Sequence, residues 1–231
     1  MTEVLLQTFS GNGQGIGISG DGLVIAFRFN DTTLRLYHRV NGVWTQKGSD
    51  IKAQANYKIR SDKIALNQDG TIILFGEFYD YSTQLYGGAA HRYEFNGTNW
   101  VKKWSSIKPT NIVANYGSDV SLTSDGKVFS VGSTHSPNDG QEKGTIEVFD
   151  WDANLNTATI RAILEGESYS QTDQYNTNTV SFDRMSKHSL SSDGNTIVVG
   201  APFHNDDNTS NSINGGRVRV FVHHIVNGVS T

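Results

Sequence analysis

The chain has 231 residues, no cysteine and a formal net charge of −4 at pH 7. The absence of cysteine excludes disulfides and thiolate metal sites, and the acidic balance without a basic stripe argues against a nucleic-acid partner. A chain of this length can bury a large core in one or two domains, and no apolar run is long enough to predict a membrane span.

One short turn recurs four times along the chain. Each copy is an Asp-Gly pair between two apolar runs, which is the strongest local indication of a β-hairpin. The four pairs are Asp21-Gly22, Asp69-Gly70, Asp125-Gly126 and Asp193-Gly194. We therefore expect four repeated β-units, and no helical period of useful length competes with that interpretation.

The predicted strands follow the same pattern in each unit. A short strand precedes the Asp-Gly turn, and a β-branched, nearly continuous apolar strand follows it, as expected for a strand buried on both faces. A variable loop then leads to a third, alternating strand, and a second turn leads to a fourth strand. In chain order the strands are expected at residues 16–18, 23–29, 34–37 and 43–46; 64–66, 71–78, 90–93 and 100–104; 120–122, 127–134, 146–149 and 158–164; and 188–190, 195–203 and 218–221.

The two ends of the chain complement each other in this pattern. The fourth unit lacks a fourth strand, and residues 4–10 have the pattern of a fourth strand with no unit before them. We therefore predict an all-β fold, a single four-bladed β-propeller whose last blade is completed by the N-terminal strand. The blades are expected at about residues 15–51, 63–107, 119–164 and 187–229, the last together with residues 4–10.

Two assemblies satisfy this pattern, a monomeric ring and a dimer. Small residues at equivalent positions of the first strands favour a ring closed within one chain, because the innermost strands of a four-bladed propeller crowd the axis. These residues are Gly17, Ala65, Ser121 and Ser189. The alternative is an eight-bladed ring of two chains, in which each fourth strand crosses to the neighbouring chain.

The fourth unit resembles a known repeat. Residues 192–202 read Ser-Asp-Gly-Asn-Thr-Ile-Val-Val-Gly-Ala-Pro, and residues 216–221 read Gly-Arg-Val-Arg-Val-Phe. This pattern is similar to the FG-GAP-like propeller repeats of microbial and viral surface proteins. Arg28 departs from it, since the other units have Gly76, Gly132 and Gly200.

The resemblance implies propeller architecture but no particular activity. Integrin-type relatives carry calcium loops with acidic residues at alternate positions. The candidate loops here, residues 136–140 and 205–208, do not keep that spacing. The adjacent His223 and His224 point to opposite faces of a strand. We therefore expect no metal and no cofactor.

The long loops of the predicted propeller lie on the face opposite to the Asp-Gly turns, and seven of the nine tyrosines fall on or beside that face. Tyrosine is common at binding surfaces because it provides rigid contact area and a hydroxyl group. We expect this face to recognise a protein or a glycan; alternatively, the rings hold their own loops in place. The candidate binding residues are Tyr57, Tyr79, Tyr81, Tyr86, Tyr116, His135, Tyr169, Tyr175, Phe203 and His204.

Catalytic motifs are sparse. The loop at residues 164–187 carries Glu165, Glu167 and Asp183. Paired carboxylates can hydrolyse a glycosidic bond at a suitable separation, but solvated loop charge is the preferred interpretation. The glycine run at residues 11–17 precedes a strand instead of opening a helix, so it does not predict a nucleotide site. We expect no catalytic residues.

These observations predict a non-catalytic interaction or structural protein. The first residues lack the charged and apolar regions of a secretion signal, and a virion component fits both that absence and the resemblance. We expect a capsid-decorating, tail or host-recognition protein, located in the virion or at an extracellular surface, with a cytoplasmic location left open. Its partner would be a protein in a larger assembly or a surface glycan. The alternatives are a soluble glycan-binding lectin and, less favoured, an enzyme that acts on polysaccharide.

Overall fold

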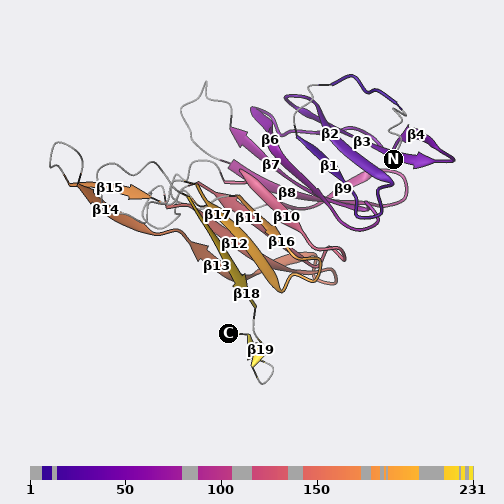
Figure 1. Ribbon diagram of the computed structural model, residues 1–231. Coiled ribbons are helices and arrows are strands. Elements are labelled where there is room, and N and C mark those ends of the chain that lie inside the picture. The colour runs from indigo at the N-terminus through magenta and orange to yellow at the C-terminus, as the bar shows by residue number, and fades with distance from the viewer. Residues whose placement is uncertain are drawn as a thin grey trace, which may run out of the picture.

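The computed structural model of the chain is all-β (Figure 1). The structure describes residues 7–11, 15–79, 88–105, 116–134, 143–172, 178–182, 185, 187–202, 216–223, 225–226 and 229–230. Within these residues there is no helix long and apolar enough to cross a membrane.

Four antiparallel sheets account for most of the strands, and each keeps its strands in sequence order. The first contains β1 (Ile16–Ile18), β2 (Val24–Asn30), β3 (Thr33–Val40) and β4 (Val43–Gln46), with β5 (Ile51–Lys52) paired to β3. The second contains β6 (Tyr57–Leu66), β7 (Ile72–Tyr79), β8 (Gly88–Phe95) and β9 (Trp100–Ser105). The third contains β10 (Asp119–Leu122), β11 (Val128–Ser133), β12 (Thr145–Asp152) and β13 (Thr157–Glu165).

The fourth sheet has three strands among the described residues. They are β16 (Lys187–Leu190), β17 (Thr196–Ala201) and β18 (Arg217–Val222). Two hairpins complete the fold. They are β14 (Ser168–Thr172) with β15 (Asn178–Phe182), and β19 (Ile225–Val226) with β20 (Val229–Ser230).

The Asp-Gly turns form as the sequence predicts, because a polar residue two positions before each aspartate fixes them. In the third sheet the Thr123 hydroxyl donates to Asp125 Oδ1 at 2.8 Å, and the same oxygen accepts from the Lys127 N–H at 2.9 Å. Gly126 then adopts a φ of 72°, the left-handed region that glycine enters without steric cost.

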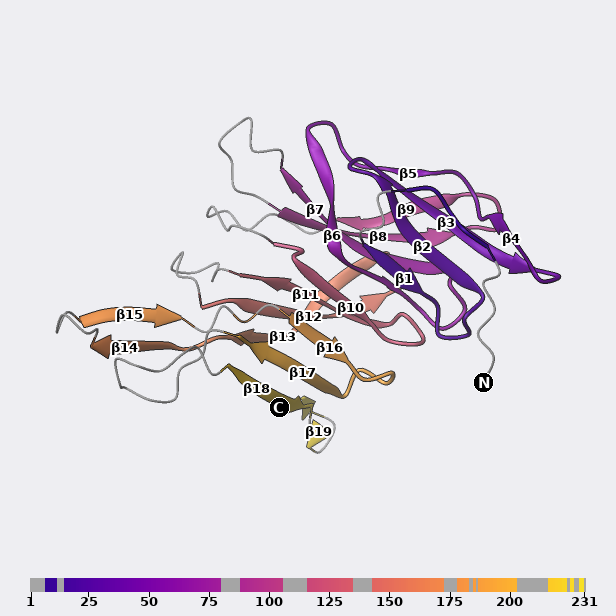
Figure 2. The same cartoon turned by 45° about the horizontal axis from the view of Figure 1, so that its top comes forward.

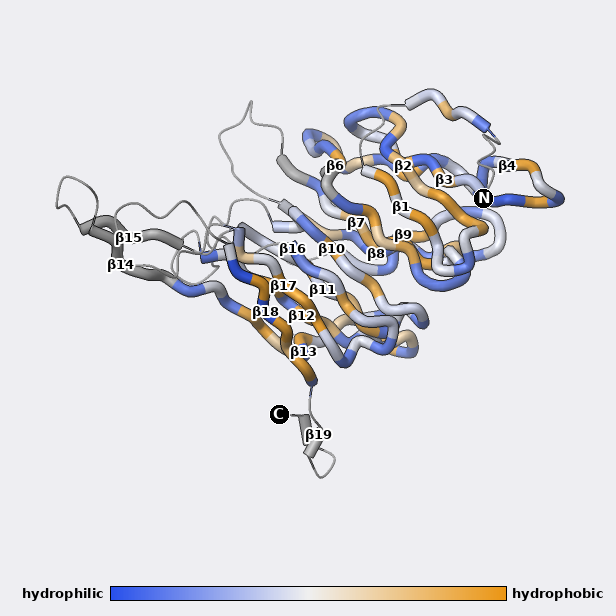
Figure 3. Tube along the Cα trace, in the orientation of Figure 1, coloured by the Kyte–Doolittle hydropathy of each residue, from blue (hydrophilic) through white to orange (hydrophobic). Residues whose placement is uncertain are grey.

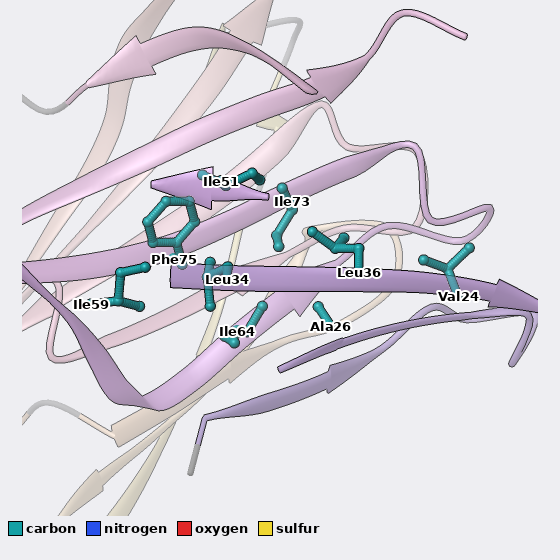
Figure 4. Close-up of a cluster of buried hydrophobic side chains, with 9 residues drawn as sticks. All are labelled: Val24, Ala26, Leu34, Leu36, Ile51, Ile59, Ile64, Ile73 and Phe75. Atoms are coloured by element: carbon teal, nitrogen blue, oxygen red, sulfur yellow. The ribbon is translucent and has the colours of Figure 1, made fainter. Parts of the chain in front are cut away.

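Neighbouring sheets pack face to face, and their innermost strands lie close together. Buried side chains of the first and second sheets form one core, which Figure 4 shows between β2, β3, β6 and β7. Two similar cores follow along the row. A Cβ built on Gly17 would lie 2.6 Å from the Ile64 carbonyl oxygen, so a larger side chain at this position would force β1 and β6 apart.

The four antiparallel sheets confirm that the fold is all-β and built from four repeated units. Residues 51–62, which lie between two predicted strands, and residues 164–187 were both predicted as long loops, and the structure shows that this is wrong in part. Residues 51–62 contain β5 and the beginning of β6, and residues 164–187 contain the β14–β15 hairpin. Both segments carry β-branched and aromatic residues that pair with a neighbouring strand, which outweighs their irregular spacing.

The predicted closure by the N-terminal strand is not seen in the described residues. Residues 7–10 are not part of a strand, and residues 4–6 lie outside the described residues. Phe9 instead packs against Phe27 and Tyr37 of the first sheet, with ring centroids 5.6 and 4.5 Å apart. In Figures 1 and 2 the sheets form a row, with the first and the fourth sheets at opposite ends.

Candidate functional site

The predicted tyrosine face is described only in part. The side chains of Tyr57 and Tyr116 are 9% and 4% exposed, so these two pack within the fold. Tyr79 ends β7 and Tyr169 lies in β14. The remaining predicted residues lie outside the described residues: Tyr81, Tyr86, His135, Tyr175, Phe203 and His204.

Tyr116 illustrates how one of these rings is held. Its hydroxyl donates to Glu147 Oε2 at 2.5 Å, which joins the segment before β10 to β12. Burial raises the pKa of Glu147 above its usual value, although the bond from Tyr116 opposes this shift. Burial also raises the pKa of Tyr116 well above its usual value. Both groups therefore resist ionisation, and the contact anchors a loop.

The first end of the row exposes an apolar surface, which we call the head face: Ile16, Ile18, Ile25 and Phe27. Ile16 and Ile18 are 71% and 63% exposed, which is unusual for such large apolar side chains. These residues line a groove of about 790 Å³, together with Phe9 and Ile64. Figure 3 shows the apolar character of β1 and β2 at this end.

The other end of the row exposes a second apolar surface, which we call the tail face: Val198, Val218, Val220 and Val222. Their side chains are 42%, 70%, 60% and 52% exposed. Val198 on β17 pairs directly with Val220 on β18, so the four side chains share one side of the sheet. Figure 3 shows the apolar residues of β17 and of the second half of β18 at this end of the row.

The head and tail faces were not identified from the sequence. The strands that carry them were predicted, but an alternating strand has the same pattern whether or not a neighbour covers it. The repeat gave the one available signal. A ring closed within one chain would cover the first and last sheets against each other, and among the described residues no sheet covers either face.

A polar cluster joins the innermost strands near the head face. The backbone N–H of His188 donates to Asp119 Oδ2 at 2.8 Å, and Lys63 Nζ donates to the backbone carbonyl oxygen of His188 at 2.8 Å. Lys63 Nζ also lies 3.9 Å from Asp119 Oδ1. His188 is buried, with 6% of its surface exposed. The cluster ties β6, β10 and β16 together.

A second polar group lies in the second sheet. His91 Nε2 is 2.9 Å from Glu77 Oε2, with both side chains buried, and His91 Nδ1 is 3.3 Å from Ser105 Oγ. A carboxylate, an imidazole and a hydroxyl in this order can activate a nucleophile. However, the Glu77–His91 contact does not have hydrogen-bond geometry, and these residues do not line the groove of the head face. We interpret the group as part of the core.

The carboxylates of the predicted loop are also placed in part. Glu167 forms ion pairs with Arg217 and Arg219 of β18, with shortest distances of 3.4 and 3.0 Å. Glu165 ends β13, and Asp183 lies outside the described residues. In the part of the chain that the structure describes, no three histidine or acidic residues are grouped to hold a metal ion.

Neither protein-family models nor curated proteins match the chain. Among solved structures, a putative 6-phosphogluconolactonase from Bacteroides uniformis is similar, with a TM-score of 0.56 and 12% identity over 94% of this chain. A hypothetical selenium-binding protein from Sulfolobus tokodaii has a TM-score of 0.42 and 14% identity, and it covers 66% of this chain. The chain spans 52% and 41% of the lengths of these two proteins.

These likenesses concern the fold alone, because the sequence identities are low. The lactonase structure supports a propeller-like arrangement of the four sheets. The chain is therefore an all-β protein of the propeller-like class.

Proposed function

We propose that the protein is a non-catalytic interaction or structural subunit, which associates with other protein through its head and tail faces. The supporting observation is the pair of exposed apolar surfaces at the two ends of the row. Isolated apolar side chains are common on protein surfaces, but contiguous patches mark sites of association. Large aliphatic side chains gathered at both ends are poorly suited to permanent contact with water.

The setting we propose is a larger particle. The resemblance to FG-GAP-like repeats favours a virion or another surface assembly, with the long-loop face as a further contact for a protein. If so, mass spectrometry of purified particles from the source should detect the chain at a fixed ratio to the major structural protein. Particles that lack the chain would contradict this setting.

The glycan-binding alternative has less support. Trp100 of β9 donates its indole N–H to the Lys47 carbonyl oxygen at 2.8 Å and packs against the core between the first two sheets. Trp104 packs against Phe129 and Phe149. These rings serve the contacts between sheets.

Substitution of the tail face tests the proposed function. In analytical ultracentrifugation we expect the wild-type chain to have an apparent mass above the 25.4 kDa of a single chain, and this apparent mass should rise with protein concentration. Val220→Asp should sediment as the single chain, because a charge cannot be buried there without a partner. The matched control is Leu155→Asp. Leu155 is 73% exposed and lies in the β12–β13 turn of the third sheet, so it belongs to neither end face. Equal sedimentation of wild type and Val220→Asp would contradict the proposal.

A further inference from the structure

We infer that the partner on both end faces is a second copy of this chain, and that two copies close an eight-bladed ring. The inference rests on the proposed function of the end faces as interfaces. In the ring the tail face of each copy packs against the head face of the other. The argument comes from the positions that occupy these faces in the other sheets.

The head face has the pattern of a surface that is buried in each later sheet. Ile16 pairs with Phe27 across β1 and β2, as Ile64 pairs with Phe75, Val120 with Val131 and His188 with Val199. The exposures of Ile64, Val120 and His188 are 3%, 0% and 6%, because the preceding sheet covers them. Ile16 is 71% exposed at the same position. The head face therefore matches a surface that receives a preceding blade.

The tail face has the complementary pattern. Val198 pairs with Val220, as Ala26 pairs with Leu36, Leu74 with Arg92 and Ser130 with Val148. In the first three sheets none of these side chains is more than 6% exposed, because the following sheet covers them. Val198 and Val220 are 42% and 60% exposed. The tail face therefore matches a surface that receives a following blade.

The Asp-Gly turns also differ between the first sheet and the later ones, because only the later turns are packed against a preceding sheet. A Cβ built on Gly70 would lie 2.4 Å from Val24 Cβ of the preceding sheet, and one on Gly126 would lie 2.4 Å from Ile72 Cδ1. Gly194 is packed against Val128 in the same manner. In the described part of the chain, no heavy atom beyond its two chain neighbours lies within 4 Å of the corresponding position on Gly22. In the ring, the residue that meets Gly22 is Thr196 of the second copy, which is equivalent to Val24.

Hydrogen bonds between turns support the same order. The Gln68 N–H donates to the Ser124 carbonyl oxygen at 2.9 Å, and the Ser124 N–H donates to that of Ser192 at 3.1 Å. This ladder links one turn to the next along the row. In the ring its next step runs from the Ser192 N–H to the Gly20 carbonyl oxygen of the second copy.

A second copy suits both faces at once. The two faces lie at opposite ends of the row, so each chain presents one head and one tail (Figures 1 and 2). A head-to-tail contact that closes after two copies leaves no free apolar end. The similar lactonase chain is about twice as long, since 94% of this chain matches 52% of it. The four sheets thus have the arrangement of about half of a larger propeller-like fold.

The N-terminal segment takes a defined place in this ring. Phe9 lies on Phe27 of the head face, and the groove beside it is incompletely filled. When the tail face of a second copy docks there, its side chains replace Phe9, and residues 7–10 come beside β18, the last strand of the fourth sheet among the described residues. They then pair as the fourth strand of that blade, in the partner copy instead of in their own chain.

A pair of cysteines tests the ring directly, because the chain contains no native cysteine. A Cβ built on Gly17 lies 3.3 Å from Ile64 Cβ, close to the range of about 3.5–4.5 Å that a disulfide requires. The equivalent pair across the proposed interface is Ser189 of one copy and Ile16 of the other. Under mild oxidation, Ile16→Cys/Ser189→Cys should form a covalent dimer in high yield. A mixture of the two single variants should form a covalent pair, and Leu155→Cys/Ser189→Cys should form no covalent dimer.

Three other results would overturn the inference. A disulfide within one chain, seen as a monomer of altered mobility, would show a four-bladed ring and would also remove the free end faces on which the proposed function rests. A ladder of covalent oligomers would show an open chain of copies. Absence of a cross-link, in a chain whose association Val220→Asp abolishes, would show a different partner geometry. The last two results would leave the proposed function intact.

Discussion

At the residue scale, the structure depends on buried polar groups whose partners come from neighbouring elements. Half-buried pairs follow the same rule: the Arg35 guanidinium lies 2.8 Å from Asp50 and lowers the pKa of that carboxyl group. Glu147 shows the opposite shift, because burial raises its pKa and Tyr116 supplies one hydrogen bond in compensation. A buried carboxylate with one donor costs stability when it ionises.

This cost predicts opposite effects for two substitutions. The pKa of Glu147 is higher in the folded than in the unfolded chain, so its contribution to stability is complete below about pH 4.3 and is lost as the pH rises through the folded pKa. Glu147→Gln keeps an acceptor for Tyr116 and should raise the free energy of unfolding at pH 7 by about 0.5–1.5 kcal/mol. Tyr116→Phe should lower it by about 1–2 kcal/mol.

Urea denaturation at pH 7 and pH 4 measures both effects. The gain from Glu147→Gln should shrink at pH 4, where the wild-type carboxyl group is protonated. A gain that is equal at both pH values would contradict a raised pKa for Glu147. A loss from Glu147→Gln at pH 7 would show that the ionised form is stabilised in the fold.

At the element scale, the Asp-Gly turns connect the blades as well as the strands. The Asp69-Gly70 turn holds Gly70 at a φ of 60°. Val24 of the preceding sheet occupies the space that a Cβ on Gly70 would need. Gly97, in the turn between β8 and β9, has a φ of 97°, and no described residue beyond its two chain neighbours places an atom within 4 Å of its Cβ position. Comparing the two glycines therefore distinguishes the cost of a positive φ, which both share, from the cost of a collision with the neighbouring sheet, which only Gly70 has.

Alanine at these two positions should cost different amounts. Gly97→Ala should lower the free energy of unfolding by about 1–2 kcal/mol, since only the left-handed conformation is penalised. Gly70→Ala should lower it by a further 1–3 kcal/mol or so, because the added methyl group collides with Val24. Thermal or urea denaturation of the two variants measures the difference. Equal losses of unfolding free energy in the two variants would contradict the role of the Asp69-Gly70 turn as a contact between sheets.

Most strands could be predicted at this scale because their signals are local. The Asp-Gly turns and the β-branched runs after them set β2, β7, β11 and β17 to within a few residues. The hairpin of β14 and β15 was missed because it has neither turn signal nor clear alternation. The surroundings of Tyr57 and Tyr116 could not be predicted, since burial in a loop depends on contacts with distant parts of the chain.

At the scale of the whole molecule, the sequence predicted the four sheets but not how the row of sheets ends. The repeat pattern is the same whether residues 4–10 complete the last blade of their own chain or of another. Exposure distinguishes these cases where sequence cannot, because Ile16 and Val220 are exposed at positions that other sheets bury. The small residues on the first strands favoured a ring within one chain. The exposed end faces lead us to propose the two-chain ring instead.

A crystal structure of the 231-residue chain tests this account most directly. We predict two copies related by a twofold axis, with Ile16 of each copy packed against the tail face of the other and both end faces buried. Residues 4–10 should pair with β18 of the partner copy. A monomer in which residues 4–10 pair with β18 of the same chain and close a four-bladed ring would contradict it.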